Sequence, residues 1–126
     1  MPSVPSVSPV QVFGTERDQA TRAALRFFKE RRVPISFVDL RKRSIAPGEL
    51  RPFVERLGAE ALLDPTSREY REAGLGYLRM DAAGIVERVL ADATLLRLPL
   101  VRHGNDVTVG RAEGVWTTWL RTGGGS

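Results

Sequence analysis

Residues 10–34 of the chain read VQVFGTERDQATRAALRFFKERRVP, and this stretch decides the fold. Its opening apolar run is short and rich in β formers, which is typical of a strand. After a polar loop, apolar residues recur at helical spacing, and Val33 before Pro34 ends the predicted helix, because a residue preceding proline leaves the helical region. Residues 35–40 then alternate as a second strand. Strand, helix and strand in tandem predict a right-handed parallel crossover.

The rest of the chain continues this pattern with further helices and a hairpin. Helical spacing predicts a helix near residues 48–57, two short helices at 59–63 and 68–73, and another after the good N-cap Asp81. A polar turn at residues 103–106 between two β-like runs predicts a hairpin, and an amphipathic helix closes the chain. The order predicts an α/β fold of the thioredoxin-like type. The predicted fold comprises a βαβ unit, a helical insert, a β-hairpin and a C-terminal helix. The βαβ unit and the hairpin supply the strands of a mixed four-stranded sheet.

The domain organisation expected from composition is simple. We interpret residues 1–9 as a disordered leader, 10–121 as one domain, and 122–126 as a flexible glycine-rich tail. The chain has no run approaching the roughly 20 apolar residues needed to cross a bilayer, and its start lacks the features of a secretion signal. We therefore expect no membrane association and a cytoplasmic location.

Composition also excludes several kinds of site. The chain has no cysteine, which excludes disulfides and thiolate nucleophiles, and its single histidine, His103, excludes multi-histidine metal sets. We therefore expect no metal and no resident cofactor. The net charge is +4, but acidic residues are interleaved with basic ones, with Arg41-Lys42-Arg43 as the one basic block. This pattern favours a mixed, solvated surface, and we expect no direct binding of nucleic acid.

The residues from Val10 to Leu120 resemble the ArsC/Spx family, which comprises glutaredoxin-type arsenate reductases, their uncharacterised relatives and the Spx transcription regulators. No single motif is specific, and the order and spacing together carry the resemblance. The matching segments are the first loop followed by Arg22, Arg32-Val33-Pro34, Asp39-Leu40, Gly48-Glu49-Leu50, Ala61-Leu62-Leu63, Tyr70 to Leu75, Leu95 to Val101, and Val109-Gly110-Arg111. The resemblance implies the thioredoxin-like fold and, for the reductases, a cysteine in the first loop that attacks arsenate.

That cysteine is missing from this chain. An ungapped comparison of the loops through Pro34 places Asp18 at the position of the family's cysteine. Thr21 falls at the second cysteine of the Cys-x-x-Cys pair of Spx. We expect Asp18 to act as an N-cap, where its carboxylate would also fill the anion site that the family's thiolate and oxyanion use. We expect Thr21 to be a surface residue or a weak cap.

The arginines that hold the oxyanion in the family are only partly matched. Arg111 matches one in place, while the family's Arg-Pro-Ile step reads Leu98-Pro99-Leu100, with Arg97 one residue earlier. The arginine of the helical insert aligns with Asp64, with Arg68 nearby. We therefore take Arg22, Arg97 and Arg111 as candidate anion-binding residues. By resemblance, Pro99 is expected to follow a cis peptide bond.

Three other side chains invite a functional interpretation. His103 lies in the predicted turn, where an exposed turn residue is a better interpretation than a catalytic one. Trp116 and Trp119 are best interpreted as core and half-buried anchors of the last helix.

Three functional hypotheses remain open at this stage. The first is an arsenate reductase-like protein without the catalytic cysteine, redox-inactive and acting by binding or regulation on an unknown protein partner. The second is an arsenate reductase that uses an external thiol such as glutathione. The third is an Spx-like regulator that docks on the RNA polymerase α-subunit.

Overall fold

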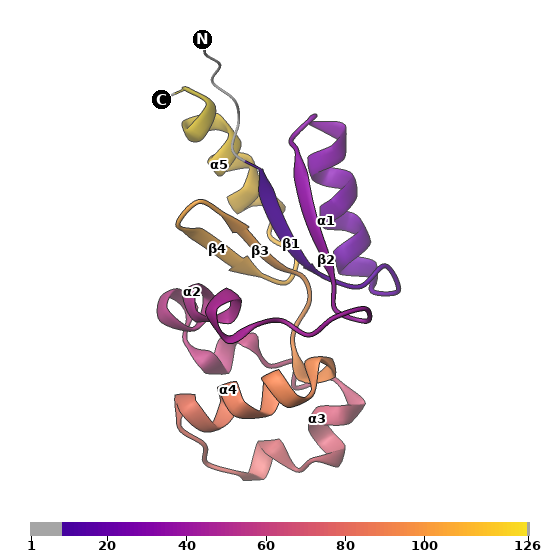
Figure 1. Ribbon diagram of the computed structural model, residues 1–126, viewed down its shortest axis with the longest axis vertical. Coiled ribbons are helices and arrows are strands. Elements are labelled where there is room, and N and C mark those ends of the chain that lie inside the picture. Colours follow the sequence, from indigo (N-terminus) through magenta and orange to yellow (C-terminus); the bar gives the residue numbers. More distant parts are fainter. Residues whose placement is uncertain (1–8, 126) are drawn as a thin grey trace.

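A four-stranded mixed sheet with helices on both faces forms the body of the computed structural model (Figure 1). The structure describes residues 9–125, except for the side chains of Tyr77 and residues 122–125. The predicted leader up to residue 8 therefore lies outside the described residues. In chain order the elements are β1 (Val10–Gly14), α1 (Gln19–Glu30), β2 (Ile35–Asp39), α2 (Pro47–Leu57), η1 (Ala59–Leu62), α3 (Arg68–Glu72), η2 (Leu75–Tyr77), α4 (Ala82–Ala91), η3 (Ala93–Leu95), β3 (Leu100–His103), β4 (Asp106–Val109) and α5 (Glu113–Gly125), where η denotes a short 3-10 helix.

The strand order is β2-β1-β3-β4, with β1 and β2 parallel and the β3-β4 hairpin antiparallel. The parallel pair is in register from Val10 opposite Ile35 to Gly14 opposite Asp39. β1 also pairs with β3, with Phe13 opposite Leu100. This arrangement confirms the α/β, thioredoxin-like fold that the element order predicts.

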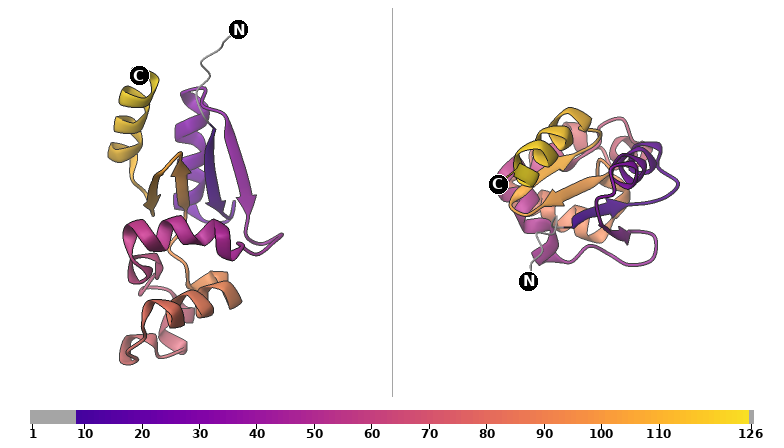
Figure 2. Two further views of the ribbon diagram at one scale, coloured as in Figure 1. Left: turned by 60° about the vertical axis from the view of Figure 1, so that its left-hand side comes forward. Right: turned by 90° about the horizontal axis from the view of Figure 1, so that it is seen from above.

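Helices α1 and α5 cover one face of the sheet (Figure 2). The alternation of β1 sends Val10 and Val12 to this face, where they pack with Phe28 of α1 and Trp116 of α5. Trp116 is fully buried and Trp119 is 8% exposed, so both belong to the core, and neither is the half-buried anchor that the sequence suggests. These contacts hold the C-terminal helix against the βα unit that begins the domain.

The opposite face of the sheet packs on α2 and on the helical insert. Phe13 of β1 lies edge-to-face on Phe53 of α2, with ring centroids 5.9 Å apart. The insert, residues 59–95, extends from the edge at which β1 and β2 end (Figure 1). In the described part of the chain, no helix has the length and apolar character needed to span a membrane.

The C-terminal part differs from the sequence-based expectation in two places. Helix α5 extends to Gly125, past the boundary at residue 121 that composition suggests. The interpretation of His103 as an exposed turn residue is wrong. His103 ends β3, its ring stacks on Trp119 at 5.9 Å between centroids, and its Nε2 is buried without a hydrogen-bond partner. The turn itself consists of Gly104 and Asn105.

A buried hydrogen bond links α5 to the hairpin, and its loss gives the first prediction. The Nε1 of Trp116 donates to the Oγ1 of Thr108 at 2.8 Å. Thr108→Val keeps the side-chain shape but removes the acceptor, leaving a buried N–H unpaired at a cost of about 1–3 kcal/mol in the free energy of unfolding. Urea titration measures the change. Thr108→Ser keeps the acceptor and should retain more of the stability, and a smaller loss for valine than for serine would contradict the role of this bond.

Candidate functional site

The loop between β1 and α1 lies at the sheet edge where both parallel strands end. Backbone and side-chain hydrogen bonds shape this loop. The N–H of Asp18 donates to the carbonyl of Thr15 at 3.0 Å, and the guanidinium of Arg22 donates to the carbonyl of Glu16 at 2.8 Å. The N–H of Leu40 bonds to the carbonyl of Gly14 at 2.8 Å, which ties the loop to the end of β2. The loop is therefore held from both sides.

Asp18 is the N-cap of α1. Its backbone is extended, with φ −85° and ψ 126°, and its Oδ2 accepts from the N–H of Thr21 at 2.7 Å. The same oxygen accepts from the hydroxyl of Thr21 at 2.8 Å. A carboxylate in this place satisfies a free N–H of the first turn and interacts favourably with the helix dipole. The start of α1 is thus capped by a carboxylate of the chain itself.

Thr21 is fully buried, so its interpretation as a surface residue is wrong. Its side chain lies against the end of β1, where a Cβ placed on Gly14 would overlap Oγ1 and lie 2.7 Å from Cγ2. Burial of the hydroxyl is compatible with packing because Asp18 accepts its hydrogen. The two positions that the family comparison pairs as cysteines are therefore joined here by a hydrogen bond.

Pro99 lies at the same end of the sheet as this loop. The antiparallel pairing of β1 and β3 ends with Phe13 opposite Leu100, and Gly14 and Pro99 are the residues that directly adjoin this last pair. The Leu98–Pro99 peptide bond is cis, the isomer that the resemblance implies. The carbonyl of Pro99 accepts from the N–H of Gly110 at 2.9 Å. Loop, proline and the end of the hairpin thus meet at one edge of the sheet.

Two of the three candidate anion-binding arginines are engaged elsewhere. Arg22 is exposed and bonds the loop backbone, as described above. Arg111 pairs with Glu113, with its Nε 3.0 Å from Oε2, and this contact lowers the pKa of Glu113 and raises that of Arg111. Arg97 lies across Gly110, where a Cβ in place of the glycine hydrogen would be 3.2 Å from Cδ of Arg97. No ion pair joins these arginines to Asp18 within residues 9–125.

Asp64, which the resemblance aligns with an arginine of the family, and the nearby Arg68 form local side-chain contacts in the insert. The carboxylate of Asp64 accepts from the N–H and the hydroxyl of Thr66, closing a turn before α3. Arg68 and Glu72 form an exposed i,i+4 pair at 3.8 Å, a geometry that contributes little to stability. Across the described residues, no group of three or more histidines, cysteines or acidic residues could hold a metal ion.

A sequence profile of the ArsC family matches residues 13–119, which include the loop, Pro99 and the hairpin. The chain belongs to the ArsC family. No curated protein sequence matches this member.

Solved structures of ArsC-type proteins share the fold of this family member. The arsenate reductase from Vibrio cholerae is 16% identical, with a TM-score of 0.79, covering 90% of this chain and 98% of its own. An arsenate reductase (ArsC) related protein from Brucella melitensis is 18% identical, with a TM-score of 0.68 and coverage of 94% and 99%. A protein described as YFFB is 19% identical, with a TM-score of 0.80 and coverage of 86% and 96%. At these identities the likeness establishes the fold.

Sequence reasoning missed the contribution of Gly14 to this site. The backbone of Gly14 contacts the side chain of Thr21, and any side chain at residue 14 would overlap the threonine. A glycine that ends a predicted strand directly before a helix-start loop is the signal that could have indicated such a close approach.

The contact between Gly14 and Thr21 generates the second prediction. Gly14→Ala should lower the free energy of unfolding by about 1–3 kcal/mol, because the new methyl overlaps a buried side chain. Removing the overlapping atoms in Gly14→Ala/Thr21→Ala should make the double mutant less destabilised than the sum of the single changes, by about 1 kcal/mol. Chemical denaturation of the four proteins gives this coupling.

The matched control is Gly48→Ala in α2, where a Cβ would meet nothing within 4 Å. Alanine is the better helix former, so this variant should be at least as stable as the parent protein. If the losses in the free energy of unfolding of the two single mutants add up to that of the double mutant, residues 14 and 21 are not in close contact.

Proposed function

We propose that this ArsC-family protein performs no thiol chemistry at its first loop and acts by binding another protein, in a regulatory role. The observation that carries this proposal is the carboxylate of Asp18, which takes two hydrogen bonds from Thr21 at the start of α1. Asp18 stands at the position that the family comparison gives to the catalytic cysteine.

Chemistry supports the proposal. Reduction of arsenate to arsenite needs two electrons, which two thiols supply when one bonds to arsenic as a thiolate and the second then joins it in a disulfide. A carboxylate cannot cycle through either state, and the chain has no cysteine anywhere that could replace it. The negative charge of Asp18 also repels an oxyanion from the N-terminus of α1.

The competing hypothesis, an arsenate reductase that takes its electrons from glutathione, would still require a bound oxyanion. Of the three candidate arginines, Arg111 is paired with the carboxylate of Glu113, and Arg22 donates to the backbone of the loop. Arg97 alone, with an exposed side chain, would have to hold an anion that Asp18 repels. This arrangement favours binding over catalysis.

Our third prediction concerns the reaction itself. Purified protein incubated with arsenate, glutathione and glutaredoxin should form arsenite no faster than the mixture without protein. An ArsC-family reductase that carries the loop cysteine serves as the positive control. Turnover above the blank would overturn the proposal.

A fourth prediction tests whether the scaffold of a thiol site persists beneath Asp18. In Asp18→Cys the new sulfur would lie at the start of α1 beside the N–H and hydroxyl of Thr21, both of which favour the thiolate. Its pKa should therefore fall below the ordinary value of about 8.5. The pH dependence of alkylation by iodoacetamide measures it.

Ser36→Cys supplies the matched control, because Ser36 is exposed within β2 and caps no helix. Its thiol should titrate near the ordinary value. Equal pKa values for the two cysteines would contradict the placement of residue 18 at an anion-favouring helix start.

The resemblance to Spx suggests the partner to test first, the α-subunit of RNA polymerase, with the cytoplasm as the expected compartment. Co-purification at low salt, with an unrelated domain of similar charge as control, tests this assignment. Absence of retention would exclude that partner and leave the lack of thiol chemistry to be judged by the arsenate assay.

A further inference from the structure

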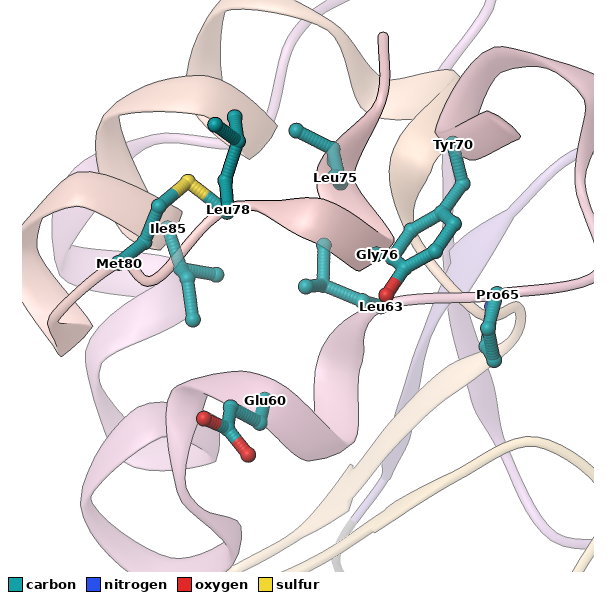
Figure 3. A pocket seen from close by; sticks show the side chains of 9 residues that line it. All are labelled: Glu60, Leu63, Pro65, Tyr70, Leu75, Gly76, Leu78, Met80 and Ile85. Carbon is teal, nitrogen blue, oxygen red and sulfur yellow. The ribbon is translucent and has the colours of Figure 1, made fainter. Parts of the chain in front are cut away.

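A partly open cavity of about 250 Å³ lies in the helical insert, and no residue of the loop of Asp18 lines it (Figure 3). Residues from η1, η2 and the start of α4, together with Tyr70 of α3, line it. Its volume is many times the roughly 30 Å³ that one water molecule occupies in the liquid, and it approaches the lower end of ordinary ligand pockets. It is therefore large enough for a small organic molecule.

Six of the nine residues that line the cavity have apolar side chains, while polar atoms form the larger share of its exposed surface. Leu63, Leu75 and Ile85 line the cavity and belong to the buried core. Met80 adds an adaptable thioether, a side chain that can adjust to the shape of a bound group. Leu78 also lines the cavity and is 47% exposed, which makes it one of two large hydrophobic side chains exposed in the described residues. Contact with an apolar ligand would remove Leu78 from water.

One carboxylate provides the charge of the site. Figure 3 shows the side chain of Glu60 on the opposite side of the cavity from Tyr70 and Leu75, below Leu63 and Ile85 in that view. Glu60 forms no ion pair within residues 9–125, although the chain has 19 lysines and arginines. Arg79 lies between two lining residues in sequence but does not line the cavity itself. The local charge therefore favours a cation.

Tyr70 provides a second group that can attract a cation. Its aromatic ring lines the cavity, and its hydroxyl points inward near Leu63 and Gly76 (Figure 3). An aromatic face attracts an ammonium group, and a phenolic oxygen can accept a hydrogen bond from one. A carboxylate, an aromatic ring and several apolar side chains are together the chemistry that recognises an amphipathic amine.

We propose that the cavity of the helical insert binds a small organic cation with one ammonium group on an aromatic or branched hydrocarbon body. The ammonium group pairs with Glu60, and the apolar body contacts Leu78, Met80 and the buried wall. This site is independent of the loop at Asp18 and stands whether or not that loop binds a protein partner.

The test compares two probes of equal shape, phenethylamine and phenethyl alcohol, in NMR titrations of the full chain. Both should shift the backbone amides of Gly76 and Leu78 saturably while those of Asp18 and Thr21 stay unchanged. The charged amine should bind up to about fivefold more tightly than the alcohol, the effect of one partly exposed ion pair. Glu60→Gln should reduce the affinity for the amine to that for the alcohol.

Filling the cavity should abolish binding of both probes. A Cβ on Gly76 would lie 3.7 Å from Cε1 and 3.9 Å from the hydroxyl oxygen of Tyr70, at ordinary contact distances, so the methyl groups of Gly76→Val occupy space beside that ring. Gly114→Val is the matched control, because a Cβ there meets nothing within 4 Å in α5, and it should bind like the parent protein. If valine at residue 76 prevents folding, Gly76→Ala should weaken both probes and replaces it.

Three results would overturn the proposal. The first is the absence of saturable shifts at Gly76 and Leu78. The second is equal affinity for the amine and the alcohol, which would contradict the assignment of a cation. The third is unchanged binding in a folded Gly76→Val variant, which would place the probes elsewhere.

Discussion

The packing of Thr21 between Asp18 and Gly14 is the constraint on which the site depends. The hydroxyl of Thr21 can be buried only because Asp18 accepts its hydrogen, and its side chain fits only because Gly14 has no Cβ. These contacts fix where α1 begins and how closely it approaches β1. A helix start held in this way is stabilised by an internal carboxylate and does not need an external anion.

The antiparallel register of β1 and β3 brings the other parts of the site to the same edge. The pairing ends with Phe13 opposite Leu100, directly after the cis-proline, and Gly110 at the end of the hairpin donates to the carbonyl of Pro99. The arginines near this edge are largely satisfied by local partners, since Arg22 bonds the loop and Arg111 pairs with Glu113. At this edge the loop carboxylate and the arginines near it are therefore bonded mainly to groups of the chain itself.

Much of this architecture could be predicted from the sequence. Apolar periodicity identifies the βαβ unit and the hairpin, and an acidic residue before a helical stripe indicates the cap. The burial of Thr21 could not be predicted, because it depends on how α1 is rotated against the end of β1. The partner of His103 could not be predicted either, since Trp119 comes from a helix that packs on the sheet only in the folded chain. The cavity of the insert could not be predicted either. Its lining residues come from several short segments, and sequence periodicity does not indicate how such segments are placed relative to one another.

The hydrogen bond between Asp18 and Thr21 has a consequence for how the protein responds to its surroundings. A pair of cysteines at these positions can exist as two thiols or as a disulfide, so the start of the helix would report the oxidation state of the solution. Aspartate and threonine have one covalent state. The first turn of α1 in this chain is therefore bonded in the same way under oxidising and reducing conditions.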